Sequence, residues 1–138
     1  MYIVCMCSDA TASVKLIATL PDLGALAKHL IYSPDDQFLM TSTISGRIQL
    51  WHATSDLYRV SSDLEGHATS IKDASFSPDS RFLATAAVEM AVIVWDMSSG
   101  GRMHAAWYGP VNCLDFISND LLVVGEATGN RRYLRINP

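Results

Sequence analysis

The chain has 138 residues, of which 49% are hydrophobic and only 17% are charged. This composition excludes disordered, collagen-like and mucin-like chains and predicts one well-buried domain. Ten Lys and Arg against fourteen Asp and Glu give a formal net charge of −4, which disfavours nucleic acid as a partner and suits a basic protein surface. No apolar run approaches the roughly 20 residues that span a bilayer. We therefore expect a cytoplasmic protein without membrane contact, with the nucleus left open as an alternative.

A repeat with a period of 44 residues organises the sequence. Tyr32–Asp35 recurs as Phe76–Asp79, and Leu50-Trp51 recurs as Val94-Trp95. Apolar residues alternate with a period near two inside each unit, and Ser-Pro-Asp and Gly-Gly turn signals separate the alternating runs. This pattern is typical of short antiparallel strands. The fold class predicted is all-β, with four-stranded antiparallel sheets.

In chain order, the repeat predicts a partial unit over residues 1–20, complete units over 21–64 and 65–107, and an incomplete unit over 108–138. The strands expected in the first complete unit are Leu26–Tyr32, Phe38–Thr43, Arg47–Trp51 and Tyr58–Leu64. The strands expected in the second are Ile71–Phe76, Phe82–Ala87, Val92–Trp95 and Arg102–Trp107. The last unit keeps a related turn sequence at Phe116–Asp120.

The second complete unit resembles a WD repeat of a β-propeller. Gly66-His67 stands ahead of the Phe76–Asp79 turn, and the unit closes with Val94-Trp95-Asp96. The resemblance is strongest in this unit and covers nearly the whole chain. It implies a partial propeller of about three blades. Because propellers close with about 4 to 8 blades, we expect either completion by the rest of a longer propeller or self-association.

In WD repeats a histidine, a strand hydroxyl, a turn acid and a tryptophan can form a hydrogen-bonded chain that fixes the blade. The matching residues of the second unit are His67, Thr85, Glu89 and Trp95. The other units depart from this set at Leu23, Ser45, Thr128 and Leu134. The resemblance therefore implies that His67 supports the blade and is not a general base.

Catalytic motifs are absent from the sequence. There is no Gly-x-Ser-x-Gly elbow, no His-Glu-x-x-His run and no phosphate-binding Gly-x-x-x-x-Gly-Lys loop. Cys5, Cys7 and Cys113 are not spaced like a disulfide framework or a paired zinc site. We therefore expect no enzymatic activity, no cofactor and no metal ion.

The resemblance implies that loops on one rim of the propeller recognise other proteins. The candidate contact residues on that rim are Thr69, Met90, Trp107, Tyr108 and Glu126. The expected function is a non-catalytic protein-interaction scaffold. An alternative comes from Gly125–Arg135, which is similar to final blades of NACHT-type signalling ATPases and implies a C-terminal propeller region that senses a ligand and inhibits the ATPase.

Overall fold

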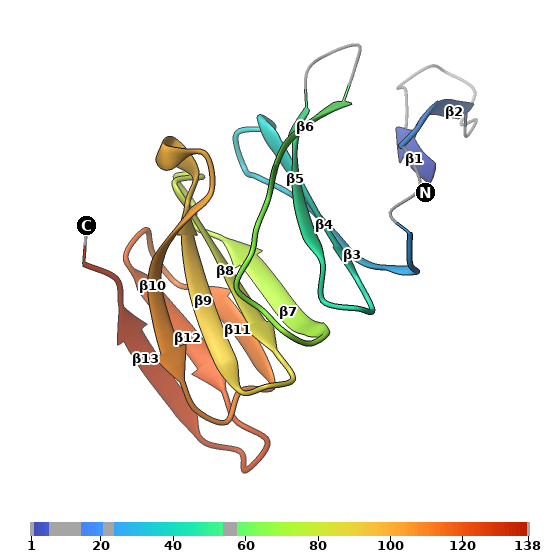
Figure 1. Cartoon of the computed structure of the whole chain (residues 1–138). Coiled ribbons are helices and arrows are strands. Elements are labelled where there is room, and N and C mark those ends of the chain that lie inside the picture. The colour runs from blue at the N-terminus through green and yellow to red at the C-terminus, as the bar shows by residue number, and fades with distance from the viewer. Residues whose placement is uncertain (1, 6–14, 21–23, 54–57, 138) are drawn as a thin grey trace.

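Strands form all of the regular structure except one short helix in the computed structural model, which describes residues 2–5, 15–20, 24–53 and 58–137 (Figure 1). β1 (Tyr2–Cys5) and β2 (Lys15–Thr19) pair as a two-stranded antiparallel sheet. The rest of the described chain forms two four-stranded sheets and one three-stranded sheet. The predicted all-β class is confirmed.

The first four-stranded sheet has its strands in sequence order, with antiparallel neighbours. It consists of β3 (Ala27–Tyr32), β4 (Phe38–Thr43), β5 (Ile48–Ala53) and β6 (Tyr58–Asp63). The predicted bounds of β4 are confirmed, and the others differ by one or two residues at their ends. Leu64 lies just beyond β6, although its N–H still donates to the carbonyl of Ile48 at 2.9 Å.

The second four-stranded sheet, which we call the central sheet, repeats this order. It consists of β7 (Ile71–Phe76), β8 (Phe82–Ala87), β9 (Ala91–Asp96) and β10 (Arg102–Tyr108). The predicted bounds of β7 and β8 are confirmed. A 3-10 helix, Met97–Ser99, joins β9 to β10 and was not predicted; the Asp96 carboxylate caps it by accepting from Ser98 N–H.

The three-stranded sheet consists of β11 (Cys113–Phe116), β12 (Leu121–Gly125) and β13 (Arg131–Arg135). Its first strand contacts β7, and β7 in turn contacts β3. The first strands of successive sheets therefore lie side by side, so the sheets stack face to face rather than joining edge to edge (Figure 1).

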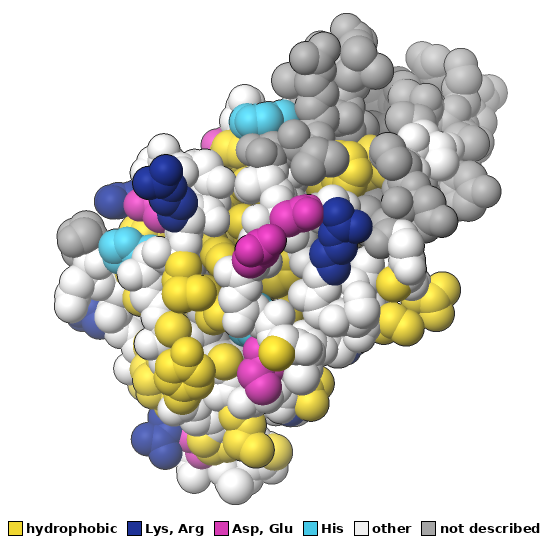
Figure 2. All heavy atoms as spheres, viewed as in Figure 1, with side chains coloured by type: hydrophobic (Ala, Val, Ile, Leu, Met, Phe, Trp, Pro, Cys, Tyr) yellow, Lys and Arg dark blue, Asp and Glu magenta, His cyan; other side chains and the backbone are white. Residues whose placement is uncertain are grey.

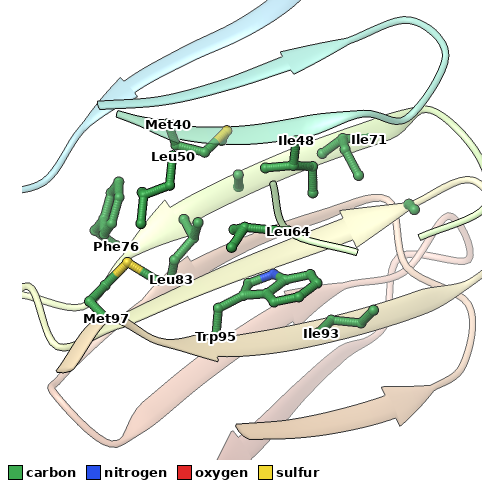
Figure 3. Close-up of a cluster of buried hydrophobic side chains, with 12 residues drawn as sticks. Met40, Ile48, Leu50, Leu64, Ile71, Phe76, Leu83, Ile93, Trp95 and Met97 are labelled. Atoms are coloured by element: carbon green, nitrogen blue, oxygen red, sulfur yellow. The ribbon is translucent and has the colours of Figure 1, made fainter. Parts of the chain in front are cut away.

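Two hydrophobic cores lie between these stacked sheets. Met40, Ile48 and Leu50 of the first sheet meet a larger group from the central sheet that includes Leu83 and Trp95 (Figure 3). The opposite face of the central sheet packs on Leu114, Phe116, Leu122 and Val124 of the three-stranded sheet. The central sheet is thus buried on both faces, which explains why every residue of β8 is buried.

The repeated Ser-Pro-Asp turns have the same geometry in both four-stranded sheets. Ser77 donates its hydroxyl to Asp79 at 2.6 Å and accepts from Phe82 N–H at 2.9 Å. Ser33 makes the corresponding bonds to Asp35 at 2.5 Å and from Phe38 at 2.9 Å. The same short polar side chains therefore close both hairpins by bonding the backbone of their own turn.

Candidate interaction rim

At one end of the stacked sheets lie the loops that precede the first strand of each sheet and the hairpin turns between its second and third strands. Val88 N–H donates to Ser70 carbonyl at 3.1 Å, and Gly109 N–H donates to Met90 carbonyl at 2.9 Å. These bonds place segments 64–70, 88–90 and 108–112 together, and turns 44–47 and 126–130 lie at the same end of their sheets. We call this end the His67 rim; its hairpin turns lie toward the bottom of Figure 1.

The structure joins His67, Thr85, Glu89 and Trp95 in one hydrogen-bonded chain. His67 Nδ1 lies 2.7 Å from the Glu89 carboxylate, and its Nε2 lies 2.8 Å from the Thr85 hydroxyl. Trp95 donates its indole N–H to the same hydroxyl at 2.9 Å. The His67 side chain is fully buried. The chain therefore links the loop before β7 to three other positions of the central sheet.

Donor and acceptor chemistry fixes the direction of two bonds in this chain. An indole N–H can only donate and a carboxylate can only accept. Thr85 therefore accepts from Trp95, and His67 Nδ1 donates to Glu89. Each of the four side chains has a hydrogen-bond partner in this chain, which is what a buried polar network requires.

Glu89 connects the hairpin turn 88–90 to the loop before β7 by hydrogen bonds. Its carboxylate also accepts from Ala68 N–H at 3.3 Å and from the Thr69 hydroxyl, and Glu89 N–H donates to Thr69 at 3.1 Å. Burial alone would raise the pKa of Glu89, but hydrogen bonds from His67 and the backbone outweigh it and lower that pKa. Glu89 is therefore an ionised, multiply bonded anchor for the turn 88–90.

The first four-stranded sheet keeps only part of this arrangement. Trp51 donates its indole N–H to Thr41 at 2.9 Å, and Thr43 pairs its hydroxyl with Ser45 at 2.8 Å. Leu23, which the repeat aligns with His67, lies outside the described residues. The tryptophan-to-threonine bond is thus shared by both sheets, whereas a carboxylate anchor belongs to the central sheet.

The three-stranded sheet replaces the polar chain with apolar side chains. Phe76 and Phe116 are equivalent residues 40 positions apart, and the same offset aligns His67 with Trp107. Strand pairing places Val124 and Leu134 at the positions equivalent to Thr85 and Trp95. Trp107 and Leu134 pack against the second core. The indole of Trp107 lies so close to Gly109 that a Cβ there would meet it at 2.3 Å.

A separate polar cluster closes the last turn of the rim, and the sequence pattern did not reveal it. Glu126 is buried and accepts from Arg132, from Thr128 at 3.2 Å and from Asn130 at 3.4 Å. The hydrogen bond from Arg132 lowers the pKa of Glu126. Glu126 and Arg132 lie on opposite sides of one hairpin turn. Their spacing in the sequence was the pattern from which this bond could have been predicted.

The five candidate contact residues fall into two groups. Tyr108 and Met90 are 76% and 56% exposed, and their segments are joined by the bond from Gly109 N–H to the Met90 carbonyl. Thr69 and Glu126 are bound within the polar clusters, and Trp107 is half-buried beside a groove of about 570 Å³ between β10 and β13. Only the first two present most of their surface to solvent.

Three further apolar residues on the rim are exposed, and none of them was among the five candidate contact residues. Leu26, Ile44 and Val88 are 72%, 52% and 50% exposed. Ile44 and Val88 are related by the 44-residue period and follow the last residue of β4 and of β8. Side-chain exposure at the first turn residue could not be deduced from alternation, because alternation ends with the strand.

The described residues contain no group of three or more His, Cys, Asp or Glu that could hold a metal ion. Cys113 is a free, exposed thiol. No helix in the described part of the chain has the length and apolar character needed to cross a membrane.

Two of three comparisons with known proteins find a match for these sheets. Residues 58–96 match the model of the family described as WD domain, G-beta repeat. A comparison with curated proteins finds no match. These 39 residues run from β6 to the end of β9 and contain the whole chain of His67, Thr85, Glu89 and Trp95.

Solved structures that superpose on this chain include a β-propeller domain and a WD40 domain. The β-propeller domain of Cps50 (Swd1) from Myceliophteria thermophila superposes with a TM-score of 0.74 at 18% identity over 89% of this chain and 39% of that one. The C-terminal WD40 domain of Sif2 gives 0.72 at 18% identity, over 90% and 36%. U3-55K gives 0.75 at 17% identity, over 85% and 38%.

The segment 58–96 therefore matches a WD repeat, and the stacked sheets have the fold of consecutive β-propeller blades. The predicted resemblance and fold are confirmed. The chain spans less than half the length of the solved propellers that it matches. From here the sheets β3–β6, β7–β10 and β11–β13 are called the first, central and last blades.

Proposed function

We propose that this chain is a non-catalytic protein-interaction module whose contact surface is the His67 rim. The observation that carries the proposal is the location of exposed apolar side chains. Among the described residues, ten large hydrophobic side chains are exposed, and five of them, Leu26, Ile44, Val88, Met90 and Tyr108, lie on this rim. Clustered apolar surface marks interaction sites because water solvates it poorly.

Rigidity of the underlying blade supports the proposal. The turn 88–90 is fastened by Glu89 to the loop before β7, and Tyr108 ends a strand of the same sheet. A surface held in one conformation loses little entropy when a partner binds. Figure 2 shows hydrophobic side chains gathered over the lower part of the molecule in that view, where the rim turns of the central and last blades lie.

The proposed partner is another protein, and the proposed location is cytoplasmic. The net charge of −4 favours a basic partner over nucleic acid. The sensor region of a NACHT-type ATPase and self-association both stay predictions: an ATPase domain elsewhere in the same polypeptide would support the first, and light scattering of the purified chain tests the second.

Affinity capture with matched variants tests the rim. The chain and its variants Tyr108→Ala and Ile117→Ser would be immobilised and exposed to the same lysate, with retained proteins compared by mass spectrometry. Ile117 is 53% exposed but lies in the turn after β11, at the opposite end of the last blade. Partners lost only with Tyr108→Ala support the rim, whereas partners retained equally by both variants contradict it.

A further inference from the structure

The first strands of neighbouring blades meet at two equivalent interfaces (Figure 1). β3 contacts β7 at the first interface, and β7 contacts β11 at the second. A lysine crosses each interface: Lys28 donates its ammonium to the Ser70 hydroxyl at 3.1 Å, and Lys72 donates to the Val111 carbonyl at 2.9 Å. The two lysines are 44 residues apart, so the period of the sequence is repeated in the contacts between blades.

Both lysines lie at the same irregularity of strand pairing. The register of β3 with β4 skips Lys28, and the register of β7 with β8 skips Lys72. Such a bulge changes the direction in which the neighbouring side chain points. The residue after the lysine is His29 in the first blade and Asp73 in the central blade. These two residues are therefore equivalent in sequence and in register.

His29 and Asp73 bond across their interfaces with different chemistry. The Asp73 carboxylate accepts from Leu114 N–H at 2.9 Å across the second interface. The His29 ring is half-buried, lies 3.0 Å from the Ser42 hydroxyl through Nδ1, and hydrogen-bonds the backbone of Lys72 across the first interface. The first interface thus holds an imidazole where the second holds a carboxylate.

Charged groups of both signs face His29. Lys28 lies on its own strand, and β7 contributes the Asp73 carboxylate and Lys72, whose ammonium bonds Val111. β4 has no ionisable residue. Burial and then the Lys28 ammonium lower the pKa of His29, and they outweigh the Asp73 carboxylate and the Lys72 backbone, which raise it. The folded interface therefore favours the neutral imidazole.

The direction of this shift determines how pH acts on the first interface. The pKa of His29 is lower in the folded chain than the ordinary value of about 6.5. The stability that the neutral imidazole contributes is complete above that value and is lost as the pH falls through the folded pKa. Histidine is the side chain whose charge ordinarily changes between pH 5 and 8, and neither strand of the second interface, β7 or β11, contains one.

We propose that His29 makes the first interface acid-sensitive: protonation places a second cation beside Lys28 in a half-buried position and opens the contact between the first and central blades. The second interface, with Asp73 at the equivalent position, stays closed. Exposed residues of the His67 rim lie on both sides of the first interface, with Ile44 on the first blade and Val88 on the central blade. Acid would therefore divide that surface, a consequence that rests on the proposed function of the rim.

Hydrogen exchange of two equivalent amides measures the opening of each interface separately. Asp35 N–H donates to Ser80 across the first interface, and Asp79 N–H donates to Asn119 across the second. Protection factors, which correct for the effect of pH on exchange itself, would be measured by NMR at pH 7.5 and 5.5. We expect the protection factor of Asp35 to fall about threefold or more at the lower pH, and that of Asp79 to stay constant.

Two variants assign the effect to one imidazole. His29→Gln keeps a polar side chain opposite Ser42 but cannot gain a proton near neutral pH, so its Asp35 protection should not depend on pH. His52→Gln is the matched control, because His52 is exposed on β5 of the same blade. This variant should keep the pH dependence of the wild type.

Several outcomes would overturn the proposal. They are constant Asp35 protection in the wild type, an equal loss at Asp35 and Asp79, and a loss that persists in His29→Gln. Titration of the His29 ring signals by NMR in the unmodified chain needs no variant, and a pKa at or above the ordinary value would also overturn it. None of these measurements involves a partner, so failure of the proposed rim function would leave them unchanged.

Discussion

Trp51 donates its indole N–H to the hydroxyl of Thr41 across 2.9 Å, and Trp95 makes the same bond to Thr85 at the same distance one blade later. All four side chains are almost completely buried. A buried indole N–H that loses its acceptor keeps its desolvation cost without compensation. The bond between the second and third strands is therefore a repeated structural element, and its removal can be compared between blades.

Valine substitution of the two threonines should have unequal effects. Thr41→Val leaves one indole N–H without its acceptor and should cost about 1 to 3 kcal/mol. Thr85→Val leaves the Trp95 indole N–H and His67 Nε2 without a partner at once, so we expect a larger loss. Urea unfolding of both variants measures the difference, and equal losses would show that the His67 bond adds nothing to the central blade.

His67→Ala should destabilise the chain by about 1 to 3 kcal/mol, because the bonds to Glu89 and Thr85 are lost inside the protein. Thermal unfolding monitored by circular dichroism measures the effect. His52→Ala is the matched control, since His52 is exposed on β5. A melting midpoint of His67→Ala equal to that of the control would rule out the structural role.

The stability contributed by Glu89 should depend on pH. Its pKa is lower in the folded chain than in the unfolded chain, so its contribution is complete above the unfolded value of about 4.3 and is lost as the pH falls through the folded value. Glu89→Gln should flatten this part of the profile. Urea unfolding between pH 3 and 7 tests it, with Glu65→Gln, an exposed position, as control.

Alanine at two glycines should separate backbone strain from contact between blades. Gly46 and Gly129 both have positive φ, but a Cβ on Gly46 would lie 2.4 Å from the carbonyl oxygen of Thr69, whereas Gly129 has no described atom within 4 Å. Gly129→Ala should cost about 1 to 2 kcal/mol. Gly46→Ala should cost about 1 to 3 kcal/mol more, from overpacking; equal unfolding free energies would contradict a tight contact.

Local pattern was enough to predict most strands and the loops of the rim, but not which side chains of the rim are exposed. Alternation and the Ser-Pro-Asp turns delimit β4, β7 and β8, because hairpin chemistry and burial are both short-range properties of the sequence. Exposure of Val88 and Met90 depends on how the chain turns after the strand ends. The positive φ of Met90 is understood only when it is compared with those of the equivalent glycines, Gly46 and Gly129.

The last blade illustrates the same limit. Trp107 was predicted either as a rim contact or as a residue packed beneath the rim loop, and the stacking of two sheets places it against the second core. The bond between Glu126 and Arg132 likewise depends on the register of β12 and β13. Contacts set by the packing of one sheet on another are not encoded in a local motif.

The hairpin turns also bond from one blade to the next. Asp35 N–H donates to the Ser80 hydroxyl at 3.0 Å, and Asp79 N–H donates to the Asn119 side chain at 3.1 Å. Each amide is protected only while the neighbouring turn stays in place, so its hydrogen exchange reports the opening of the adjacent blade. Opening of one blade should thus release its neighbour's amide, and the blades should unfold as a nearest-neighbour coupled array.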